Sequence, residues 1–305
     1  MNSYKFYQAD VFTNQPLTGN PLAVFPDALG LRDETMQALA REMNLSETTF
    51  VFPSDQATKL VRFFTPAAEI PLAGHPTIGT WWILAELGKV ELPREGTRRV
   101  TQGTGAGILP VDIHVQDGAP SRVVMVQALP AFGPVFPDPA QLGEALGGTE
   151  TTVLRDPAPQ VVSTALPQLM VPIRSLGELQ ELPSGGGGAR LSNLLRQVGT
   201  DCAMCYTLET TDPSTTVHCR MFAPGLGVPE DPATGSAAGA LGSYLVQRGV
   251  VQARNGVATV VVEQGIEIGR PSRIDVEISV GELAEIHEVR VGGQAVTVIR
   301  GEVQV

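Results

Sequence analysis

Short segments in which apolar and polar residues alternate recur along nearly the whole chain. Alternation with a period of two is typical of half-buried β-strands. The segments that show it are 5–12, 48–53, 59–64, 112–116, 122–128, 202–208, 216–222, 257–264, 273–279 and 295–301. Helical spacing is less frequent, so the pattern predicts a mixed fold in which short strands outnumber helices.

Two of the predicted helices are apolar or small on nearly every side. They span 77–88 and 236–249, and each ends in a glycine, Gly88 or Gly249, suited to the left-handed residue that follows a helix. A helix without a polar face is expected to be buried. The segment 31–44 instead places apolar residues on one side only, which predicts an outer amphipathic helix.

Two further helices are predicted on either side of a glycine run. The helices are expected at 175–182 and 189–199, and the run PSGGGG lies between them at 183–188. Consecutive glycines lose much conformational freedom on ordering, so we expect a flexible surface loop there.

The sequence contains a degenerate internal repeat. VRFFTP at 61–66 returns as CRMFAP at 219–224, and VTQGTGAGILPVDIHV at 100–115 returns as VEQGIEIGRPSRIDVEI at 262–278. One apolar helix lies between these anchors in each half. The residues that the second pair shares are Gln102 with Gln264 and Gly103 with Gly265. The repeat predicts two similar α+β domains, each a sheet wrapped around a central helix.

The repeat also suggests where the domains meet. We place the N-terminal half at 1–120, joined by the C-terminal strand 292–305, and the C-terminal half at 121–291. If a pseudo-twofold axis relates the halves, the starts of the two central helices face each other across a cleft. Small-molecule sites commonly lie in such a cleft.

Composition and charge exclude several classes of function. The chain of 305 residues is 43% hydrophobic and 17% charged, as expected of a globular protein, and carries a formal net charge of −11. This charge opposes binding to nucleic acid. No apolar run is long enough to span a membrane, and the first residues lack the pattern of a signal peptide. A cytoplasmic protein without a membrane partner is expected.

Three cysteines raise the question of a metal site. Cys202, Cys205 and Cys219, together with His218, resemble a zinc-binding spacing. Both segments are predicted strands, however, so Cys202 and Cys205 face opposite sides, as do His218 and Cys219. Reduced thiols and no bound metal are therefore expected.

Two glycine-containing segments have alternative interpretations. GTGAG at 103–107 resembles part of a dinucleotide fingerprint, but a strand follows it where the fingerprint requires a helix. PEDPATGSAAG at 229–239 lacks the lysine of a phosphate-binding loop and the GxSxG elbow of a serine nucleophile. The remaining interpretation is a helix start, at which the hydroxyls of Thr234 and Ser236 are suited to capping.

The other half offers a second helix start in PLAGHPTIGT at 71–80. Gly74 allows close approach to the backbone, Pro76 is expected near the first helical position and Thr77 near the start. The first N–H groups of a helix have no partner within it, and the helix dipole favours an anion there. A substrate carboxylate is one candidate anion, and two capped structural helices are the alternative.

Acidic residues near these helix starts favour a catalytic interpretation. Asp231 precedes the second helix, whereas the aligned position in the first half, near Ala73 or Gly74, has no acid. Glu47 enters a predicted buried strand, which is costly unless the carboxyl group is paired or used. A carboxyl group partly removed from water can act as a general base. His75 is a candidate donor of a hydrogen bond or a proton, although a structural role for it is equally open.

These segments resemble the phenazine-biosynthesis PhzF-like family, within the diaminopimelate-epimerase-like superfamily. The resemblance covers nearly the whole chain and rests on GNPLAVF, NLSETTFVF, RFFTPAAEIPLAGHPTIGT and RMFAPGLGVPEDPATGSAAGALGSYL, in that order. It implies the diaminopimelate-epimerase-like fold, with the site between the two domains. The cysteines that exchange the proton in epimerases of this fold are absent from both helix starts, so racemisation by two thiols is excluded.

The resemblance implies a cofactor-independent isomerase of a small, cyclic carboxylate. The catalytic residues that it implies are Glu47, as general acid and base, with His75, Asp231 and Ser236. The candidate substrate-binding residues are Asn20, Gly74, Thr77, Thr234 and Gly235. No cofactor or metal is implied, and family members are usually homodimers.

The sequence departs from the family pattern at one position, and two alternative functions remain. Ala165 stands where the family often has glycine, which puts close approach of a ligand to that backbone in question. A two-base epimerase that uses Glu47 and Asp231 is one alternative function. A catalytically silent interaction protein of the same fold is the other.

Overall fold

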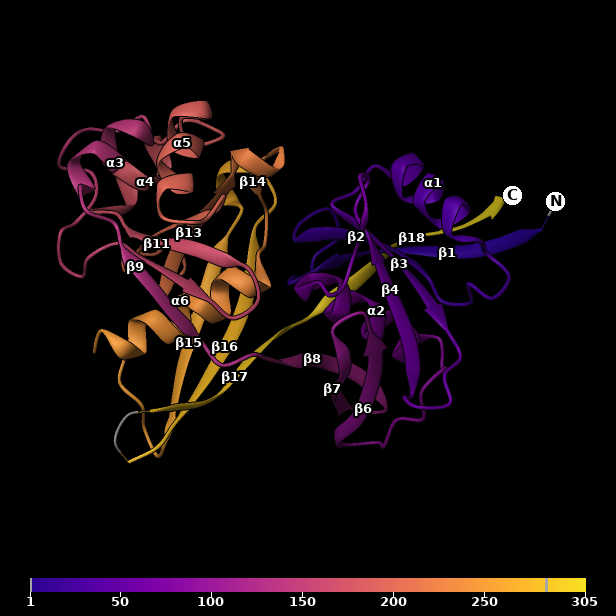
Figure 1. Cartoon of the computed structure of the whole chain (residues 1–305). Helices are drawn as coiled ribbons and strands as arrows, with labels where there is room; N and C mark the ends of the chain where they lie inside the picture. The colour runs from indigo at the N-terminus through magenta and orange to yellow at the C-terminus, as the bar shows by residue number, and fades with distance from the viewer. Residues whose placement is uncertain (1, 283–284) are drawn as a thin grey trace. The chain divides into compact units, whose positions relative to one another are not determined.

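The computed structural model describes residues 2–282 and 285–305, and the chain forms two compact units (Figure 1). Unit 1 comprises Met1–Val126 and Gly292–Val305, and unit 2 comprises Gln127–Val291. The C-terminal strand pairs antiparallel with the N-terminal strand, which explains why both chain ends belong to unit 1.

Unit 1 consists of strands and two α-helices. The helices are α1 (Asp33–Met43) and α2 (Gly74–Glu86). The strands are β1 (Ser3–Val11), β2 (Asn20–Phe25), β3 (Glu47–Phe52), β4 (Lys59–Phe64), β5 (Glu69–Ile70), β6 (Gly96–Thr104), β7 (Gly107–Gln116), β8 (Ala119–Gln127) and β18 (Ala295–Gln304). Strand β8 leads the chain into unit 2.

Unit 2 carries more helices than unit 1. They are α3 (Pro139–Ala145), α4 (Leu176–Glu181), α5 (Ala189–Gln197) and α6 (Gly235–Gln247), with the short 3₁₀-helices η1 (Pro224–Leu226) and η2 (Ile266–Ile268). The strands are β9 (Ala131–Val135), β10 (Gln160–Ser163), β11 (Pro167–Pro172), β12 (Ala203–Thr207), β13 (Val217–Ala223), β14 (Val228–Asp231), β15 (Val257–Gln264), β16 (Ser272–Val280) and β17 (Ile286–Gly293). Strand β17 returns the chain to unit 1.

Both units repeat one order of strand pairing. In unit 1, β2 and β3 are parallel, β3 and β4 antiparallel, β4 and β5 antiparallel, and β4 and β6 parallel. In unit 2, the pairs β11–β12, β12–β13, β13–β14 and β13–β15 have the same directions in the same order. Helices α2 and α6 follow β5 and β14 at corresponding points. The repeat in the sequence is therefore a repeat of structure.

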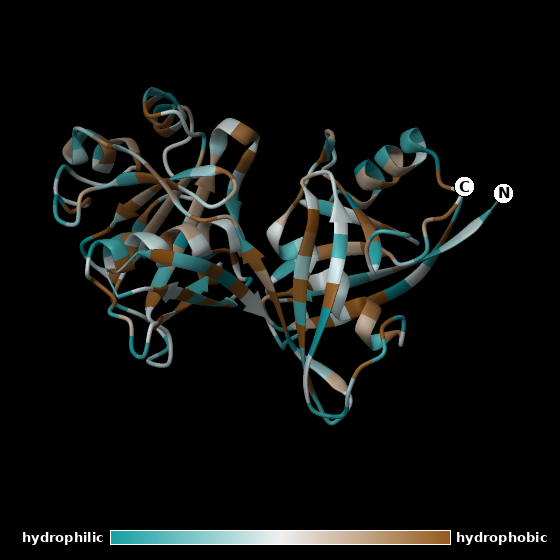
Figure 2. Ribbon diagram, turned by 60° about the horizontal axis from the view of Figure 1, so that its bottom comes forward, coloured by the Kyte–Doolittle hydropathy of each residue, from teal (hydrophilic) through white to brown (hydrophobic). Residues whose placement is uncertain are grey.

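The helices α2 and α6 form the centres of their units, as the apolar pattern predicts. Residues 75–85 of α2 and 237–245 of α6 are buried. A Cβ on Gly79 would lie 2.7 Å from the side chains of Leu22 and Val11, so this glycine lets α2 pack closely on β1 and β2. Figure 2 shows brown and teal bands alternating along the strands, as expected of sheets with one buried face.

Both central helices end at the predicted glycines. Gly88 has φ 65° and Gly249 has φ 69°, the left-handed conformation that suits the residue after a helix. Each helix has 13 residues. None of the helices in the described ranges is both long enough and apolar enough to cross a lipid bilayer.

Helix α1 is the outer amphipathic helix expected from the sequence. Its buried residues are Met36, Leu39 and Ala40, and it ends at Asn44, which adopts φ 50°. The aromatic core beneath it includes Phe25 and Phe50, whose rings stack with centroids 4.8 Å apart.

The glycine run of unit 2 packs closely on its neighbours, so the expectation of a surface loop is wrong at Gly185 and Gly186, which are buried. Gly185 to Gly188 all adopt positive φ. A Cβ on Gly187 would lie 1.8 Å from the carbonyl oxygen of Ala145, and one on Gly186 would lie 2.7 Å from the ring of Phe222. Glycine is required here because a side chain would collide with the neighbouring backbone and ring.

Candidate active site

Glu47 and His75 come together within unit 1. Glu47 is the first residue of β3, and His75 is the second residue of α2. Glu47 Oε2 lies 3.3 Å from His75 Nε2, and the side chains are 18% and 7% exposed. The pairing of β3 with β2 and the close packing of α2 thus bring the carboxyl group of Glu47 to the start of α2.

His75 is a neutral imidazole near pH 7. Burial lowers the pKa of the ring to about 3. An anionic carboxylate at 3.3 Å favours the protonated ring, but the loss of hydration dominates for this buried side chain. The imidazole can therefore donate or accept a hydrogen bond without carrying a charge.

Helix α2 begins at Gly74, three residues earlier than expected. Ala73 is its N-cap in extended conformation, and within the described residues no side chain caps the helix. Pro76 consequently occupies the third helical position instead of a position near the first. The N–H groups of Gly74 and His75 lie at the positive end of the helix dipole, where an anion is favoured.

Thr77 and Asn20 are buried within unit 1. The Thr77 hydroxyl donates to the Ala73 carbonyl at 2.9 Å and accepts from Gln102 Nε2 at 3.1 Å. Gln102 Oε1 in turn accepts from Trp81 Nε1 at 3.0 Å. Asn20 is fully buried at the first residue of β2. The Thr77 hydroxyl therefore helps to hold the first turn of α2.

Asp231 and Thr234 form the polar approach to α6 in unit 2. The Thr234 hydroxyl donates to Asp231 Oδ2 in a short hydrogen bond. Gln264 Nε2 donates to the Asp231 carbonyl at 2.7 Å and to Thr234 Oγ1 at 3.1 Å. The expectation that Thr234 caps α6 through its side chain is wrong, because the hydroxyl binds the preceding carboxylate instead.

Ser236 and Gly235 begin α6, and their backbone and side chain contact polar residues of nearby strands. Ser236 Oγ accepts a hydrogen bond from Gln168 Nε2 at 3.0 Å. The Gly235 carbonyl accepts from Gln127 Nε2 at 3.0 Å. Ala165 is exposed in the turn between β10 and β11. The hydroxyl of Ser236 is thus held by an amide, which is not a base able to activate it as a nucleophile.

The strand registers give the structural counterpart of Asp231. Asp231 pairs with Met221, and Ile70 pairs with Phe63 at the matching point of the repeat. The counterpart is therefore Ile70, not Ala73 or Gly74 as the sequence alignment suggests. The conclusion that unit 1 has no acid at this position holds.

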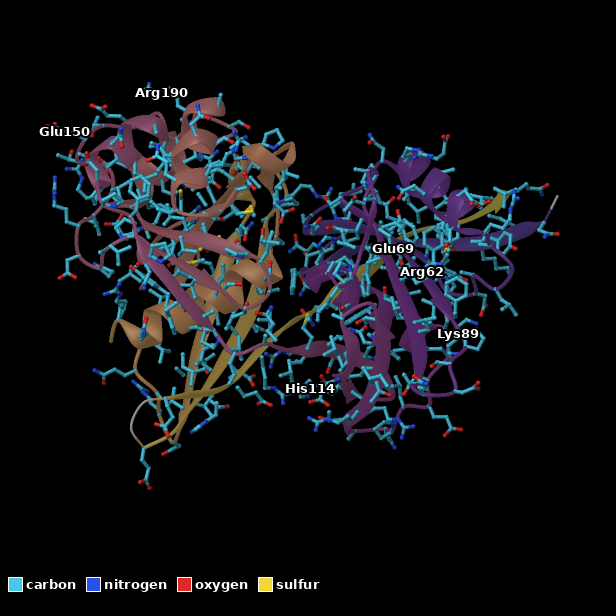
Figure 3. The ribbon with its side chains drawn as sticks, in the orientation of Figure 1. Arg62, Glu69, Lys89, His114, Glu150 and Arg190 are labelled. Carbon is cyan, nitrogen blue, oxygen red and sulfur yellow. The ribbon has the colours of Figure 1, made fainter. Side chains whose placement is uncertain are left out.

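An ion pair is repeated beside these positions. In unit 1, Arg62 Nε and Nη2 donate to Glu69 Oε1 and Oε2 at 2.7 and 2.6 Å (Figure 3). In unit 2, Arg220 Nε and Nη2 donate to Glu230 Oε1 and Oε2 at 2.8 and 2.7 Å. The second pair is buried, with side chains 2% and 3% exposed. Each pair anchors the short strand that leads into its central helix.

The counterpart of Glu47 in unit 2 is a thiol. Thr48 pairs with Phe64 and Ala203 with Phe222, so the preceding residues, Glu47 and Cys202, correspond. Burial and then the nearby Asp201 and Asp231 raise the pKa of Cys202 to about 12. This thiol is protonated near pH 7, so the carboxyl group of Glu47 has no basic counterpart at this position of unit 2.

His218 of unit 2 is buried between two carboxylates, an arrangement that its spacing from the cysteines did not indicate. His218 Nδ1 lies 2.7 Å from Glu263 Oε1, and Nε2 lies 2.8 Å from Glu267 Oε1. Burial alone lowers the pKa of His218, but the hydrogen bonds that the ring donates to the carboxylates of Glu267 and Glu263 outweigh it and raise the pKa. In residues 2–282 and 285–305, no cluster of three or more histidine, cysteine or acidic side chains has a metal-binding arrangement.

A hollow of about 450 Å³ lies at the opposite end of α2 from His75. Its walls include Trp82 and Glu86 of α2, Asp117 and Gln294. Neither Glu47 nor His75 contributes to it. The cavity and the carboxyl–imidazole pair are therefore separate features of unit 1.

Comparison with known protein sequences identifies the family of the chain. The profile of the PhzC-PhzF family, described as phenazine biosynthesis-like protein, matches residues 9–301. An uncharacterized isomerase of Clostridium acetobutylicum is 37% identical over 99% of this chain and 98% of its own length. A trans-2,3-dihydro-3-hydroxyanthranilate isomerase of Pseudomonas fluorescens is 35% identical over 96% of this chain and 97% of its own length.

Solved structures share the fold. The crystal structure of a PhzF-family phenazine biosynthesis protein from Bacillus anthracis is 30% identical, with a TM-score of 0.91 and all of both chains covered. A hydroxyproline epimerase from Agrobacterium vitis is 14% identical, with a TM-score of 0.67 over 99% of this chain and 92% of its own. The latter likeness concerns the fold alone. The expected diaminopimelate-epimerase-like α+β fold is confirmed.

The relatives also settle the broad class of the protein. Several of those that match nearly the whole chain are named isomerases, and two of them are named for the same small-molecule substrate. The expected enzyme class, an isomerase, is confirmed. By its sequence and its fold, the chain belongs to the PhzC-PhzF family of phenazine biosynthesis-like proteins.

Proposed function

We propose that the protein is a cofactor-independent isomerase that moves a proton between carbons of a small, cyclic carboxylate. Glu47 is the general acid and base. The observation that carries the proposal is the 3.3 Å approach of Glu47 Oε2 to His75 Nε2 at the start of α2. Similarity to a trans-2,3-dihydro-3-hydroxyanthranilate isomerase supports a cyclic substrate with an amino, a hydroxyl and a carboxylate group.

The reaction needs one base and no net change of oxidation state. The Glu47 carboxylate takes a proton from a carbon that is alpha or vinylogous to the substrate carboxylate. The electrons of that C–H bond shift the double bond and delocalise into the carboxylate, forming an enolate-like anion. The protonated Glu47 exchanges its proton with water and then protonates a different carbon, so the product is an isomer of the substrate.

Neutral groups and helix N–H donors support this anion. N–H groups at the start of α2 stabilise negative charge that develops near them. His75 is neutral because burial lowers its pKa to about 3, so it can donate a hydrogen bond without competing for the proton. Asp231 and Ser236 bind polar substituents of the substrate in this proposal.

Turnover in D₂O tests the proposed function. The purified protein is incubated with trans-2,3-dihydro-3-hydroxyanthranilate and with a panel of cyclic and amino carboxylates. The proposal predicts a product of unchanged mass in H₂O, a shifted double bond, and deuterium at the carbon that receives the proton. Inversion at one carbon with no shift of the double bond indicates a two-base epimerase instead. Absence of turnover and of deuterium exchange across the panel contradicts the proposal.

A further inference from the structure

Polar side chains from three strand regions converge on the first turn of α6. The Gln127 amide at the end of β8 donates to the Gly235 carbonyl at 3.0 Å. The hydroxyl of Thr164, which follows β10, lies 2.7 Å from Gln127 Oε1 and 3.2 Å from the Ser236 carbonyl. These contacts hold the backbone at the start of the helix and leave the side chain of Ser236 to a different partner.

That partner is Gln168, on β11. The side chain of Gln168 is 1% exposed, and its Nε2 lies 3.0 Å from Ser236 Oγ. An amide N–H can only donate, so the serine oxygen accepts this hydrogen bond. The single proton of the Ser236 hydroxyl then points away from Gln168 and is available to another acceptor.

We infer that Gln168 is a positioning residue that fixes Ser236 as a hydrogen-bond donor to the substrate. The inference rests on the proposed function and adds a chemical requirement to it. The substrate presents a hydrogen-bond acceptor, such as a carboxylate or hydroxyl oxygen, to Ser236. Gln168 does not contact the substrate and acts through the serine hydroxyl.

The geometry of the hydrogen bond distinguishes two substitutions at Gln168. Methionine has nearly the same length as glutamine but provides no donor. In Gln168→Met, the hydroxyl of Ser236 is therefore free to rotate. Glutamate places an acceptor at the same point. In Gln168→Glu, the hydroxyl of Ser236 therefore donates its hydrogen bond to the new carboxylate and cannot donate it to the substrate. A merely structural role predicts no such order between the two variants.

Both substitutions are made in the wild-type protein and in Ser236→Ala, and kcat and KM are measured with the carboxylate that the wild type turns over. We expect kcat/KM to fall about tenfold in Gln168→Met and about a hundredfold in Gln168→Glu, the effects of one and of two lost or misdirected hydrogen bonds. In the Ser236→Ala background, each substitution at Gln168 is expected to change kcat/KM less than about twofold. Gln197→Met, at an exposed glutamine of α5, is the control and leaves kcat/KM unchanged.

Equal fold losses in the presence and absence of the serine hydroxyl would overturn the inference, since Gln168 would then not act through Ser236. Thermal unfolding of each variant identifies losses that come from misfolding. An independent readout is the ¹⁵N–¹H signal of the Gln168 amide. It is expected to shift in Ser236→Ala, and an unchanged signal contradicts the hydrogen bond. If the wild type turns over no carboxylate, the proposed function fails, and the amide signal alone decides whether Gln168 binds Ser236.

Discussion

The carboxyl group of Glu47 and the imidazole of His75 approach to 3.3 Å, one at the start of a strand and the other at the start of the central helix of unit 1. The imidazole is buried and neutral, whereas the side chain of Glu47 is 18% exposed. A partly exposed acidic side chain thus lies beside a donor that does not compete for protons. This combination is suited to proton transfer at carbon.

The neutral state of His75 predicts an acid-dependent stability. Burial lowers its pKa from 6.5 to about 3, so between these values the unfolded ring binds a proton and the folded ring does not. This contribution to stability is therefore present above pH 6.5 and is lost as the pH falls towards 3. In His75→Gln, the melting temperature should fall less between pH 7 and pH 4 than in the wild type. His287→Gln, at an exposed histidine, is the control, and its melting temperature should fall as much as that of the wild type. An equal fall in His75→Gln would contradict the lowered pKa of His75.

The repeated ion pair offers a comparison of burial within one protein. Arg220 and Glu230 are 2% and 3% exposed, whereas Arg62 and Glu69 are 24% and 41% exposed. Arg220→Met leaves a buried carboxylate without its partner and should cost about 3–5 kcal/mol of unfolding free energy. Arg62→Met should cost less than about 1 kcal/mol, because water and salt screen the exposed pair. Urea unfolding measures both, and equal losses would contradict the role assigned to burial.

The buried His218 contributes a stability with the opposite pH dependence. Its two carboxylate partners raise its pKa, so its contribution is present below pH 6.5 and is lost as the pH rises through the raised value. Glu267→Gln should therefore cost about 2 kcal/mol at pH 6 and less at pH 9. Urea unfolding at the two pH values measures the difference. Glu150→Gln, at an exposed glutamate (Figure 3), is the control, and a larger loss at pH 9 in Glu267→Gln would count against the charged ring.

Gly239 should be intolerant of a side chain. A Cβ at this position of α6 would lie 2.0 Å from Gln127 Oε1 and 3.0 Å from Val291. Gly239→Ala should displace the Gln127 amide and cost about 1–3 kcal/mol of unfolding free energy. Gly177, in α4, has open space where its Cβ would be. Gly177→Ala should therefore be neutral or stabilising by up to about 1 kcal/mol, and a similar result for Gly239→Ala would refute the steric argument.

Much of the fold could be predicted because local signals and the repeat agree. The apolar helices before Gly88 and Gly249 are buried and end at those glycines. Gln102 and Gln264, which the repeat matched by letter alone, both bind the start of the central helix of their unit. Each central helix needs a buried amide beside its start, so a glutamine recurs at the matching position of both halves of the sequence.

Features that depend on tertiary packing were not predictable. Helix α3 has only 7 residues, which include Pro139, one glycine and two alanines, so it gives little periodicity. The glycine run at 185–188 gives the same sequence signal whether it is mobile or packed against Ala145 and Phe222. The contact of Gln168 with Ser236 joins distant parts of the chain, and no local pattern indicates it.

Replacement of Glu47 shows whether this carboxyl group is the base. Glu47→Gln keeps the shape of the side chain but removes the base, so kcat should fall by a factor of about 10²–10⁴. Glu47→Asp should retain part of the activity, and Glu34→Gln, at an exposed position of α1, should retain all of it. The decisive measurement is deuterium incorporation from D₂O into the product. If Glu47 is the base, Glu47→Gln abolishes this incorporation while the protein stays folded, and incorporation at the wild-type rate rules out Glu47 as the base.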